Sequence, residues 1–201
     1  MRSLSLSLIA LNLATPAAAQ TVTARPVNAN VEVLVTDLGK GVYRFSFFGD
    51  YAKPNGDLDF TAVKSPVKIN FTIHQNSAAG IRFASAAEDA MWIVEKSKAG
   101  PSGEPEARYQ GAQFTEFTRV NANGRKLSVL DRNDDGKTWQ YALRFDLAPR
   151  ADNAPAPDQQ TALAFLETQK DGVYEYAAMF EGPNGAMLVM DPKIQNGTTG
   201  N

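Results

Sequence analysis

The segment Asp-Arg-Asn-Asp-Asp-Gly at residues 131–136 is the motif in this chain that comes closest to a metal site. Asp131, Asn133 and Asp135 match the first half of a calcium-binding loop, in which alternate oxygen ligands surround a hard cation. The second half does not match, because Ala142 stands where the loop needs a bidentate carboxylate. A plain turn built from Asn, Asp and Gly explains the same residues. We expect that turn, with calcium binding as the alternative.

His74 is the only histidine, and it ends an alternating segment on its polar side. One imidazole in a chain without cysteine cannot form the usual zinc or copper sites without further ligands. A Ser-His-Asp triad would need this histidine as its base, but no Gly-x-Ser-x-Gly motif is present to supply the nucleophile. We therefore expect His74 to be a solvated surface residue.

Paired carboxylates offer a second kind of chemistry. Glu88 with Asp89, or Glu104 with Glu106, could serve a glycosidase, which needs two carboxyl groups at a set separation across a sugar. Neighbouring positions in the sequence do not establish that separation. We assign no catalytic residue, and hydrolysis of a cell-envelope polymer by carboxylate chemistry is the alternative function.

Aromatic side chains are the remaining group from which a site could be built. Trp and Tyr on a sheet face can stack on sugars or anchor a protein partner. Five aromatics stand out, although such residues belong to a core more often than to a site. They are Trp92, Trp139, Tyr141, Tyr174 and Tyr176.

Short runs of alternating apolar and polar residues, separated by Gly, Asn, Asp and Pro, dominate the chain and are typical of strands and turns. The cleanest is residues 67–74, where the alternation predicts a strand with one buried and one wet face. We expect about ten to twelve strands. The other candidates are residues 31–36, 43–47, 81–84, 91–95, 114–120, 127–131, 138–147, 163–168, 173–180 and 186–190.

Three segments look like copies of one hairpin, at residues 33–47, 127–145 and 163–180. Each runs through an apolar strand, a polar turn, a glycine and then alternating aromatics. Glycine supplies the positive φ that a tight turn needs. We expect three hairpins, and internal duplication remains open.

Helical patterns are nearly absent. Ser85 followed by Glu88 matches a capping box, so the sequence predicts at most one short helix, at residues 85–90. Residues 98–113 and 148–160 are rich in Pro, Gly and Ala and predict long loops. Neither requires a domain boundary, so we expect a single domain over residues 20–201.

The amino-terminal residues predict export. Arg2 is followed by an apolar run at residues 4–14, and Ala17 and Ala19 provide the small positions of a signal-peptidase site. The apolar run is shorter than the roughly 20 residues of a spanning helix. We expect cleavage after Ala19, a periplasmic or secreted protein, and no membrane span in the mature chain.

The amino-acid composition excludes further classes of function. The formal net charge is −2, and Lys and Arg are scattered among a slight excess of acids, which argues against a nucleic-acid partner. Cysteine is absent, so neither disulfides nor thiol chemistry is available, although an exported compartment would allow disulfides. The fold must rest on apolar burial, for which 43% hydrophobic residues suffice.

The hairpin with Asn-Asp-Gly and aromatics at residues 126–145 and the ending at residues 185–197 resemble a group of small exported bacterial proteins of uncharacterised function. The Asp-Pro-x-Ile-x-Asn ending is carried by Asp191, Pro192, Ile194 and Asn196. The resemblance implies a cupredoxin-like or immunoglobulin-like sandwich and brings no activity. Copper-binding cupredoxins use a cysteine, which this chain lacks, so blue-copper function does not carry over. The Pro- and Ala-rich insertion within residues 147–174 departs from the pattern.

Taken together, alternating strands and regular turn signals predict an antiparallel β-sandwich. The function that we expect is an exported, non-catalytic binding or accessory module for a small molecule, a glycan or a protein partner. We expect no cofactor, with calcium as the one exception considered above.

Overall fold

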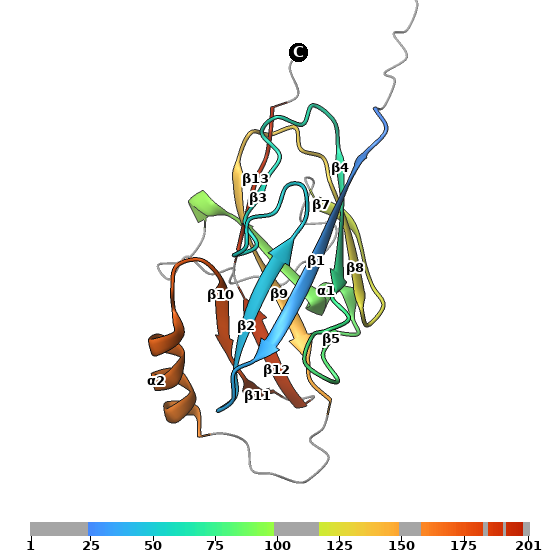
Figure 1. Cartoon of the computed structure of the whole chain (residues 1–201). Coiled ribbons are helices and arrows are strands. Elements are labelled where there is room, and N and C mark those ends of the chain that lie inside the picture. The colour runs from blue at the N-terminus through green and yellow to red at the C-terminus, as the bar shows by residue number, and fades with distance from the viewer. Residues whose placement is uncertain (1–23, 99–116, 149–157, 183–184, 191, 199–201) are drawn as a thin grey trace, which may run out of the picture.

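The computed structural model describes five stretches of the chain, and Figure 1 draws the remaining residues as a thin grey trace. The described stretches are residues 24–98, 117–148, 158–182, 185–190 and 192–198. They contain strands β1 to β13 in two sheets, with two helices and one 3-10 turn. The predicted all-β sandwich is thereby confirmed. The expected leader at residues 1–19 and most of the expected loops at 98–113 and 148–160 lie outside the described residues.

The first sheet, sheet A, has six strands in the order β10-β2-β1-β4-β8-β7. Their bounds are β1 Val27–Asp37, β2 Val42–Phe48, β4 Val67–Ile73, β7 Phe117–Ala122, β8 Lys126–Asp131 and β10 Glu175–Ala178. Strand β1 is antiparallel to β2 but parallel to β4. A parallel pair needs a crossover connection, and here the chain leaves sheet A after β2, forms β3 in the other sheet and then returns as β4.

The second sheet, sheet B, is built around β9 at Thr138–Asp146. Strands β12 (Gly185–Met190) and β13 (Lys193–Gln195) pair along one edge of β9, and β5 (Arg82–Phe83) and β6 (Met91–Glu95) pair along the other. Strands β3 (Leu58–Asp59) and β11 (Phe180–Gly182) complete the sheet. The pairing of β13 with β3 is parallel, so the predicted antiparallel sandwich contains two parallel pairings, this one and that of β1 with β4. Strands β3 and β13 were not predicted, because two or three residues leave no room for alternation.

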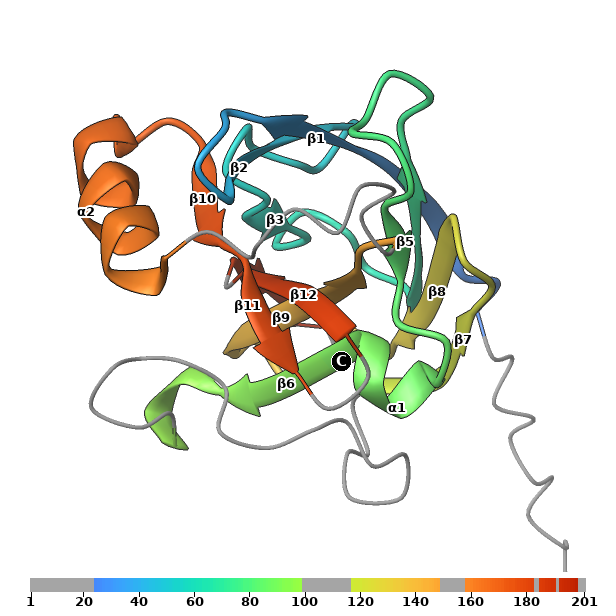
Figure 2. The same ribbon diagram turned by 90° about the horizontal axis from the view of Figure 1, so that it is seen from below.

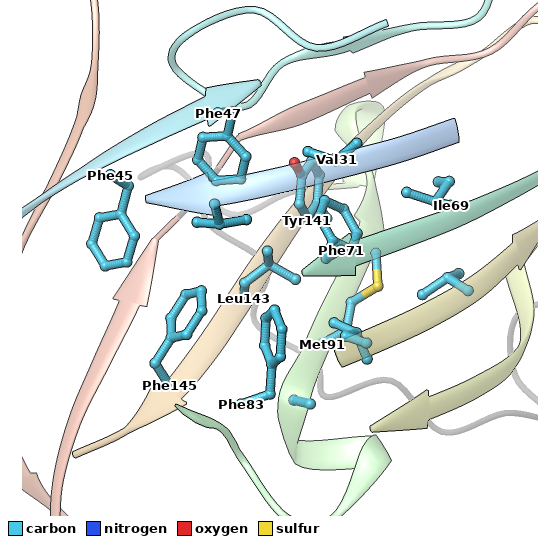
Figure 3. Close-up of a cluster of buried hydrophobic side chains, with 14 of the residues drawn as sticks. Val31, Phe45, Phe47, Ile69, Phe71, Phe83, Met91, Tyr141, Leu143 and Phe145 are labelled. Carbon is cyan, nitrogen blue, oxygen red and sulfur yellow. The ribbon is translucent and has the colours of Figure 1, made fainter. Parts of the chain in front are cut away.

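The core lies between the two sheets, where alternate residues of each long strand are buried. Phe45 of sheet A meets Phe145 of sheet B with ring centroids 5.3 Å apart, and Phe83 stacks on Phe145 at 4.9 Å (Figure 3). Burial of an aromatic side chain of this kind stabilises a fold by roughly 2–3 kcal/mol. Contacts between aromatic side chains thus hold the two sheets together in a chain that has no cysteine to form disulfides.

Helix α1 (Ala87–Ala90) forms a single turn near the predicted place, followed after β6 by a 3-10 turn at Lys96–Lys98. The predicted capping box is wrong, because the N-cap residue is Ala86 and no side chain caps the helix. Ser85 therefore lies one position too early to cap the first turn.

Helix α2 (Gln159–Gln169) stands where the sequence pattern predicted a strand at residues 163–168, and that prediction was wrong. The Asp158 side chain caps the helix by accepting from the Thr161 N–H. Ala162 and Leu166, four positions apart, form its buried face. The run is rich in Ala, Leu, Gln and Glu, which favour helix over strand. The apolar residues within 163–168 therefore belong to a helix and not to the strand that we predicted. The expected limit of one short helix is exceeded.

Of the three expected hairpins, only the first is present. Strands β1 and β2 form it, with positive φ at Gly39, Lys40 and Gly41. The second was wrong, because β8 and β9 belong to different sheets and residues 132–137 cross between them. The third was wrong because α2 replaces its first strand. The three segments do not share one structure.

Candidate functional site

The candidate site lies on the outer face of sheet A, the face that is turned away from the core. Helix α2 lies beside β10 and β2 at one end of this face (Figures 1 and 2). No other described element covers it. Asn30 and Glu32 of β1, Lys68 of β4 and Lys126 of β8 are accordingly exposed. The exposed part of the face therefore lies on β1, β4 and β8, with helix α2 at one boundary.

Helix α2 is held on this face by a small apolar cluster. Ala162 and Leu166 are buried against Val42 of β2, with Phe165 packed at the margin. The Lys40 ammonium lies 4.8 Å from the centre of the Phe165 ring, which is a cation–π contact. This cluster fixes the position of the chain that leads from α2 into β10.

Asp171 organises the turn between α2 and β10. Its Oδ1 accepts hydrogen bonds from the backbone N–H groups of Val173 and Tyr174 at 2.8 and 3.1 Å, and its Oδ2 accepts from the Tyr176 hydroxyl at 3.0 Å. These bonds hold the pKa of Asp171 below its usual value, with the Val173 N–H as the largest cause. One carboxylate thus fixes the two tyrosines that enter β10.

The two tyrosines join Arg44 and Phe48 to form what we call the aromatic strip: Arg44, Phe48, Tyr174 and Tyr176. Tyr176 pairs in register with Arg44, and the Arg44 guanidinium lies 5.1 Å from the centre of the Tyr174 ring. Phe48, at the end of β2, is 50% exposed. Burial, followed by the bond to Asp171, raises the pKa of Tyr176. The strip therefore combines fixed rings with one cation.

A polar row continues across the sheet beyond the strip. The Asn70 Nδ2 donates to the Asn30 Oδ1 at 3.2 Å, and the Ser128 hydroxyl donates to the Asn70 Oδ1 at 2.9 Å. These residues come from β1, β4 and β8 and face one another in the strand register. The polar row presents amide and hydroxyl groups side by side on three neighbouring strands.

Most of the charged side chains that point outward from the described strands of this face are positive, while the Asp171 carboxylate lies beside the strip. Lys68 and Lys126 are exposed there, and neither forms an ion pair with a described carboxylate. Glu32 is the one carboxylate among the outward residues of β1, β2, β4, β8 and β10. Its Oε2 lies 3.9 Å from the Nε2 of His74, a surface residue whose side chain is 27% exposed.

The predicted calcium ligands lie elsewhere, in a buried network at the end of the sandwich. The Asp131 Oδ1 accepts from the Asn133 backbone N–H at 2.9 Å and from the Asn196 Nδ2 at 3.2 Å. The Asn133 Oδ1 accepts from the Gly197 N–H at 2.6 Å. Asp131 and Asn133 are both fully buried, and Asn133 has a φ of 53°. Backbone and amide donors thus already bind one carboxylate oxygen of Asp131 and the amide oxygen of Asn133.

Asp135 takes part in the same network. Its Oδ1 accepts from the Lys137 N–H at 2.9 Å and from the Asn196 Nδ2 at 3.2 Å, and its Oδ2 accepts from the Trp139 Nε1 at 3.0 Å. No group of three or more His, Asp or Glu residues within the described stretches is placed to hold a metal ion. This geometry favours a structural turn, and calcium binding stays an untested alternative.

Two motifs that are far apart in the sequence meet in this network. Asn196 of the Asp-Pro-x-Ile-x-Asn ending bridges the two aspartates of the 131–136 loop. Beside it, a Cβ on Gly197 would lie 2.8 Å from the Val63 carbonyl oxygen and 2.9 Å from that of Phe60, so only glycine fits there. The carboxyl-terminal segment is therefore locked into the sandwich.

The predicted aromatics divide between core and surface. Trp139 and Tyr141 are buried, and the Tyr141 hydroxyl donates to the Gly56 carbonyl at 2.7 Å. Burial raises the pKa of Tyr141 well above its usual value. Trp92 is half-buried on the outer side of sheet B, opposite Ala142. Only Tyr174 and Tyr176 belong to the candidate site.

The carboxyl groups offer little support for acid–base chemistry. A glycosidase needs an acid with a raised pKa close to a second carboxylate. Asp89 is half-buried at α1, while the Glu88 side chain and both Glu104 and Glu106 lie outside what the structure describes. Four described carboxyl groups have a lowered pKa. These groups are Asp59, Glu95, Asp158 and Asp171, on separate segments.

Sequence reasoning missed two members of the strip. Arg44 was read only as a polar residue between aromatics, and Phe48 was not singled out. A signal for Phe48 was present: Phe47 and Phe48 are consecutive in a strand, so they must point to opposite faces, and Phe47 belongs to the buried alternation. The Arg44–Tyr174 contact depends on the pairing of β2 with β10, which no local pattern contains.

None of the described helices has the length and apolar character needed to cross a membrane. No protein-family model matches this chain, and no curated protein matches it.

Proposed function

We propose that this chain is an exported, non-catalytic binding module whose binding surface is the outer face of sheet A. The observation that carries the proposal is Phe48, half exposed at the end of β2 on the same face as the Arg44–Tyr174 pair. A large exposed aromatic close to other ordered aromatic side chains is typical of a recognition surface.

The strip is suited to binding because its parts are already ordered. Asp171 fixes the turn that carries Tyr174 and the hydroxyl of Tyr176, and Arg44 is held against the Tyr174 ring. Side chains that are fixed before a ligand arrives lose little rotamer entropy on binding. The face can therefore gain affinity without reorganising.

Catalysis is less well supported than binding. The four shifted carboxyl groups are all held in their charged form, whereas hydrolysis of a glycosidic bond needs one carboxyl group that keeps its proton near neutral pH. No observation on the described residues favours the hydrolytic alternative.

The proposal is tested by a thermal-shift screen of the purified protein against soluble polysaccharides, peptidoglycan fragments and small metabolites. A ligand that binds the folded state raises Tm. We expect at least one ligand to raise the Tm of the wild type and of Leu163→Ala, but not that of Phe48→Ala. Leu163 is the matched control, because it is 47% exposed and lies on α2, away from the strip. A shift retained in full by Phe48→Ala, or release of reducing ends from a polysaccharide, would contradict the proposal.

Export is part of the proposal and has a separate test. Mass spectrometry of the protein recovered from the periplasm or medium of an expressing bacterium should give a chain that begins at Gln20. Replacement of Ala17 and Ala19 by Leu should block the cleavage, because signal peptidase needs small residues there. Recovery of a chain that retains Met1 from the cytoplasm alone would contradict export.

A further inference from the structure

We propose that the ligand of the outer face is a glycan strand that carries carboxylate groups. This inference rests on the proposed function and adds the chemical class of its partner. It starts from three kinds of group that the face presents together: the rings of the aromatic strip, the amides and hydroxyl of the polar row, and two exposed lysines.

The charge of the face favours an anionic partner. The whole chain carries a formal net charge of −2, yet the outward strand residues of sheet A include Arg44, Lys68 and Lys126 against the single carboxylate of Glu32. In other regions described by the structure, several lysines and arginines are paired with acids, as Lys137 is with Glu95 at 2.9 Å. Lys68 and Lys126 thus keep their charge available to a ligand.

The strand register places these groups in straight lines across the sheet. Phe48, Glu32, Thr72 and Lys126 share one row through the pairings of β2, β1, β4 and β8. Three strand spacings separate Phe48 from Lys126, or about 14 Å. The polar row runs parallel to this line, two residues nearer the amino-terminal ends of β1 and β4. An extended polymer lying across the strands would meet the Phe48 ring, the Glu32 carboxylate, the Thr72 hydroxyl and the Lys126 ammonium in turn along this row, and the amides and hydroxyl of the polar row beside it.

Each kind of group matches one feature of an acidic polysaccharide. The C–H face of a sugar ring stacks on an aromatic side chain, hydroxyls exchange hydrogen bonds with Asn30, Asn70 and Ser128, and uronate carboxylates pair with lysine ammonium groups. A polymer rich in hydroxyls and carboxylates matches exposed amides and lysines, whereas the energy of a protein partner is concentrated in a few aromatic and arginine anchors packed into pockets. The negative charge of Glu32 repels carboxylates. The carboxylates of the ligand must therefore lie closer to Lys68 and Lys126 than to Glu32.

The test is isothermal titration calorimetry of the purified protein with polygalacturonate and with its fully methyl-esterified form. The two polymers share one backbone and differ in charge. We expect polygalacturonate to bind at least about tenfold more tightly at low salt, and the difference to shrink as salt rises. Dextran serves as the neutral sugar control, and polyphosphate as the anion without sugar rings.

Matched variants locate the contact. Lys68→Met with Lys126→Met should weaken binding of polygalacturonate about tenfold, since each cation contributes a modest ion pair. Lys96→Met with Lys193→Met removes the same charge from the sheet B side and should leave binding unchanged. Glu32→Gln should strengthen binding severalfold, because it removes a like charge.

The outcomes separate this inference from the proposed function. Equal affinity for the acid and its methyl ester, or equal affinity for polyphosphate, would overturn the acidic-glycan inference. The proposed function would survive either result as long as Phe48→Ala abolishes binding of the same polymer. If no polysaccharide binds the wild type, the inference fails. The proposed function fails as well if no ligand of any class depends on Phe48.

Discussion

Asn196 is a buried polar residue that stabilises the sandwich by joining two distant parts of the chain. Its Nδ2 group donates to both Asp131 and Asp135, and it is 1% exposed. Hydrogen bonds to carboxylates are stronger than neutral ones, and loss of the Asn196 amide removes one donor from each of the two carboxyl groups in a buried site. The sequence pointed to these residues as a motif, but their partners lie about sixty positions away, so no local pattern could assign their role.

Replacement of Asn196 by alanine should therefore destabilise the fold by about 3 kcal/mol. The midpoint of urea unfolding, followed by tryptophan fluorescence, measures the effect. Asn76→Ala is the matched control, because Asn76 is exposed and should change stability by less than about 0.5 kcal/mol. Equal midpoints for the two variants would show that the buried network adds no stability.

The same network gives a prediction about calcium. Amide and backbone N–H groups donate to the oxygens of Asp131, Asn133 and Asp135, so an added cation would have to displace them. We expect Tm to be unchanged by calcium in excess over the protein, and unchanged by a chelator. A rise in Tm with calcium that Asp135→Asn abolishes would establish the calcium loop instead.

Glu95 gives stability a defined pH dependence. The Ser97 hydroxyl and then Lys137 lower the pKa of Glu95 from its usual value to about 2. A carboxyl group with a lowered pKa stabilises the fold above its ordinary pKa, and this contribution is lost as pH falls through the folded-state pKa. Wild type should thus be more stable than Glu95→Gln at pH 6, and the gap in urea midpoint should narrow by pH 2.5. A gap of equal size at both pH values would contradict this pKa.

At the scale of elements, α2 is the part that sequence patterning described least well. Its apolar residues are few, and the run at residues 163–168 fits a short strand as well as a helix. The deciding features were the Asp158 cap and the four-residue spacing of Ala162 and Leu166. The long strands were predicted well, because two-residue alternation follows directly from one buried face. The pairing partners of the strands were not predicted correctly. Strand β8 pairs with β4 and β7, whereas we expected it to form a hairpin with β9.

Helix α2 should detach when its anchor is shortened. Leu166→Ala removes a largely buried side chain that packs on Val42, and should cost about 2–3 kcal/mol of stability. Leu163→Ala, in the same helix but 47% exposed, should cost far less. Hydrogen exchange of the α2 and β10 amides measures the effect locally. If both variants exchange alike, the helix is not held by this cluster.

At the scale of the whole molecule, the chain is a sandwich whose two sheets have different outer faces. Sheet A carries α2 at one end (Figures 1 and 2). Its outer face also carries the ordered rings of the aromatic strip, the amides of the polar row, and the exposed Lys68 and Lys126. Sequence reasoning reached the sandwich. It could not locate the surface, because the strip is assembled from β2 and β10, which lie more than a hundred residues apart.

The central claim is that binding takes place on the outer face of sheet A, and amide chemical-shift mapping during a polygalacturonate titration tests it most directly. The account predicts shifts along β1, β2, β4 and β8, centred between Phe48 and Lys126, with the amides of β6, β9 and β13 unchanged. Shifts confined to the strands of sheet B, or spread over loops with β1 and β4 unaffected, would contradict it.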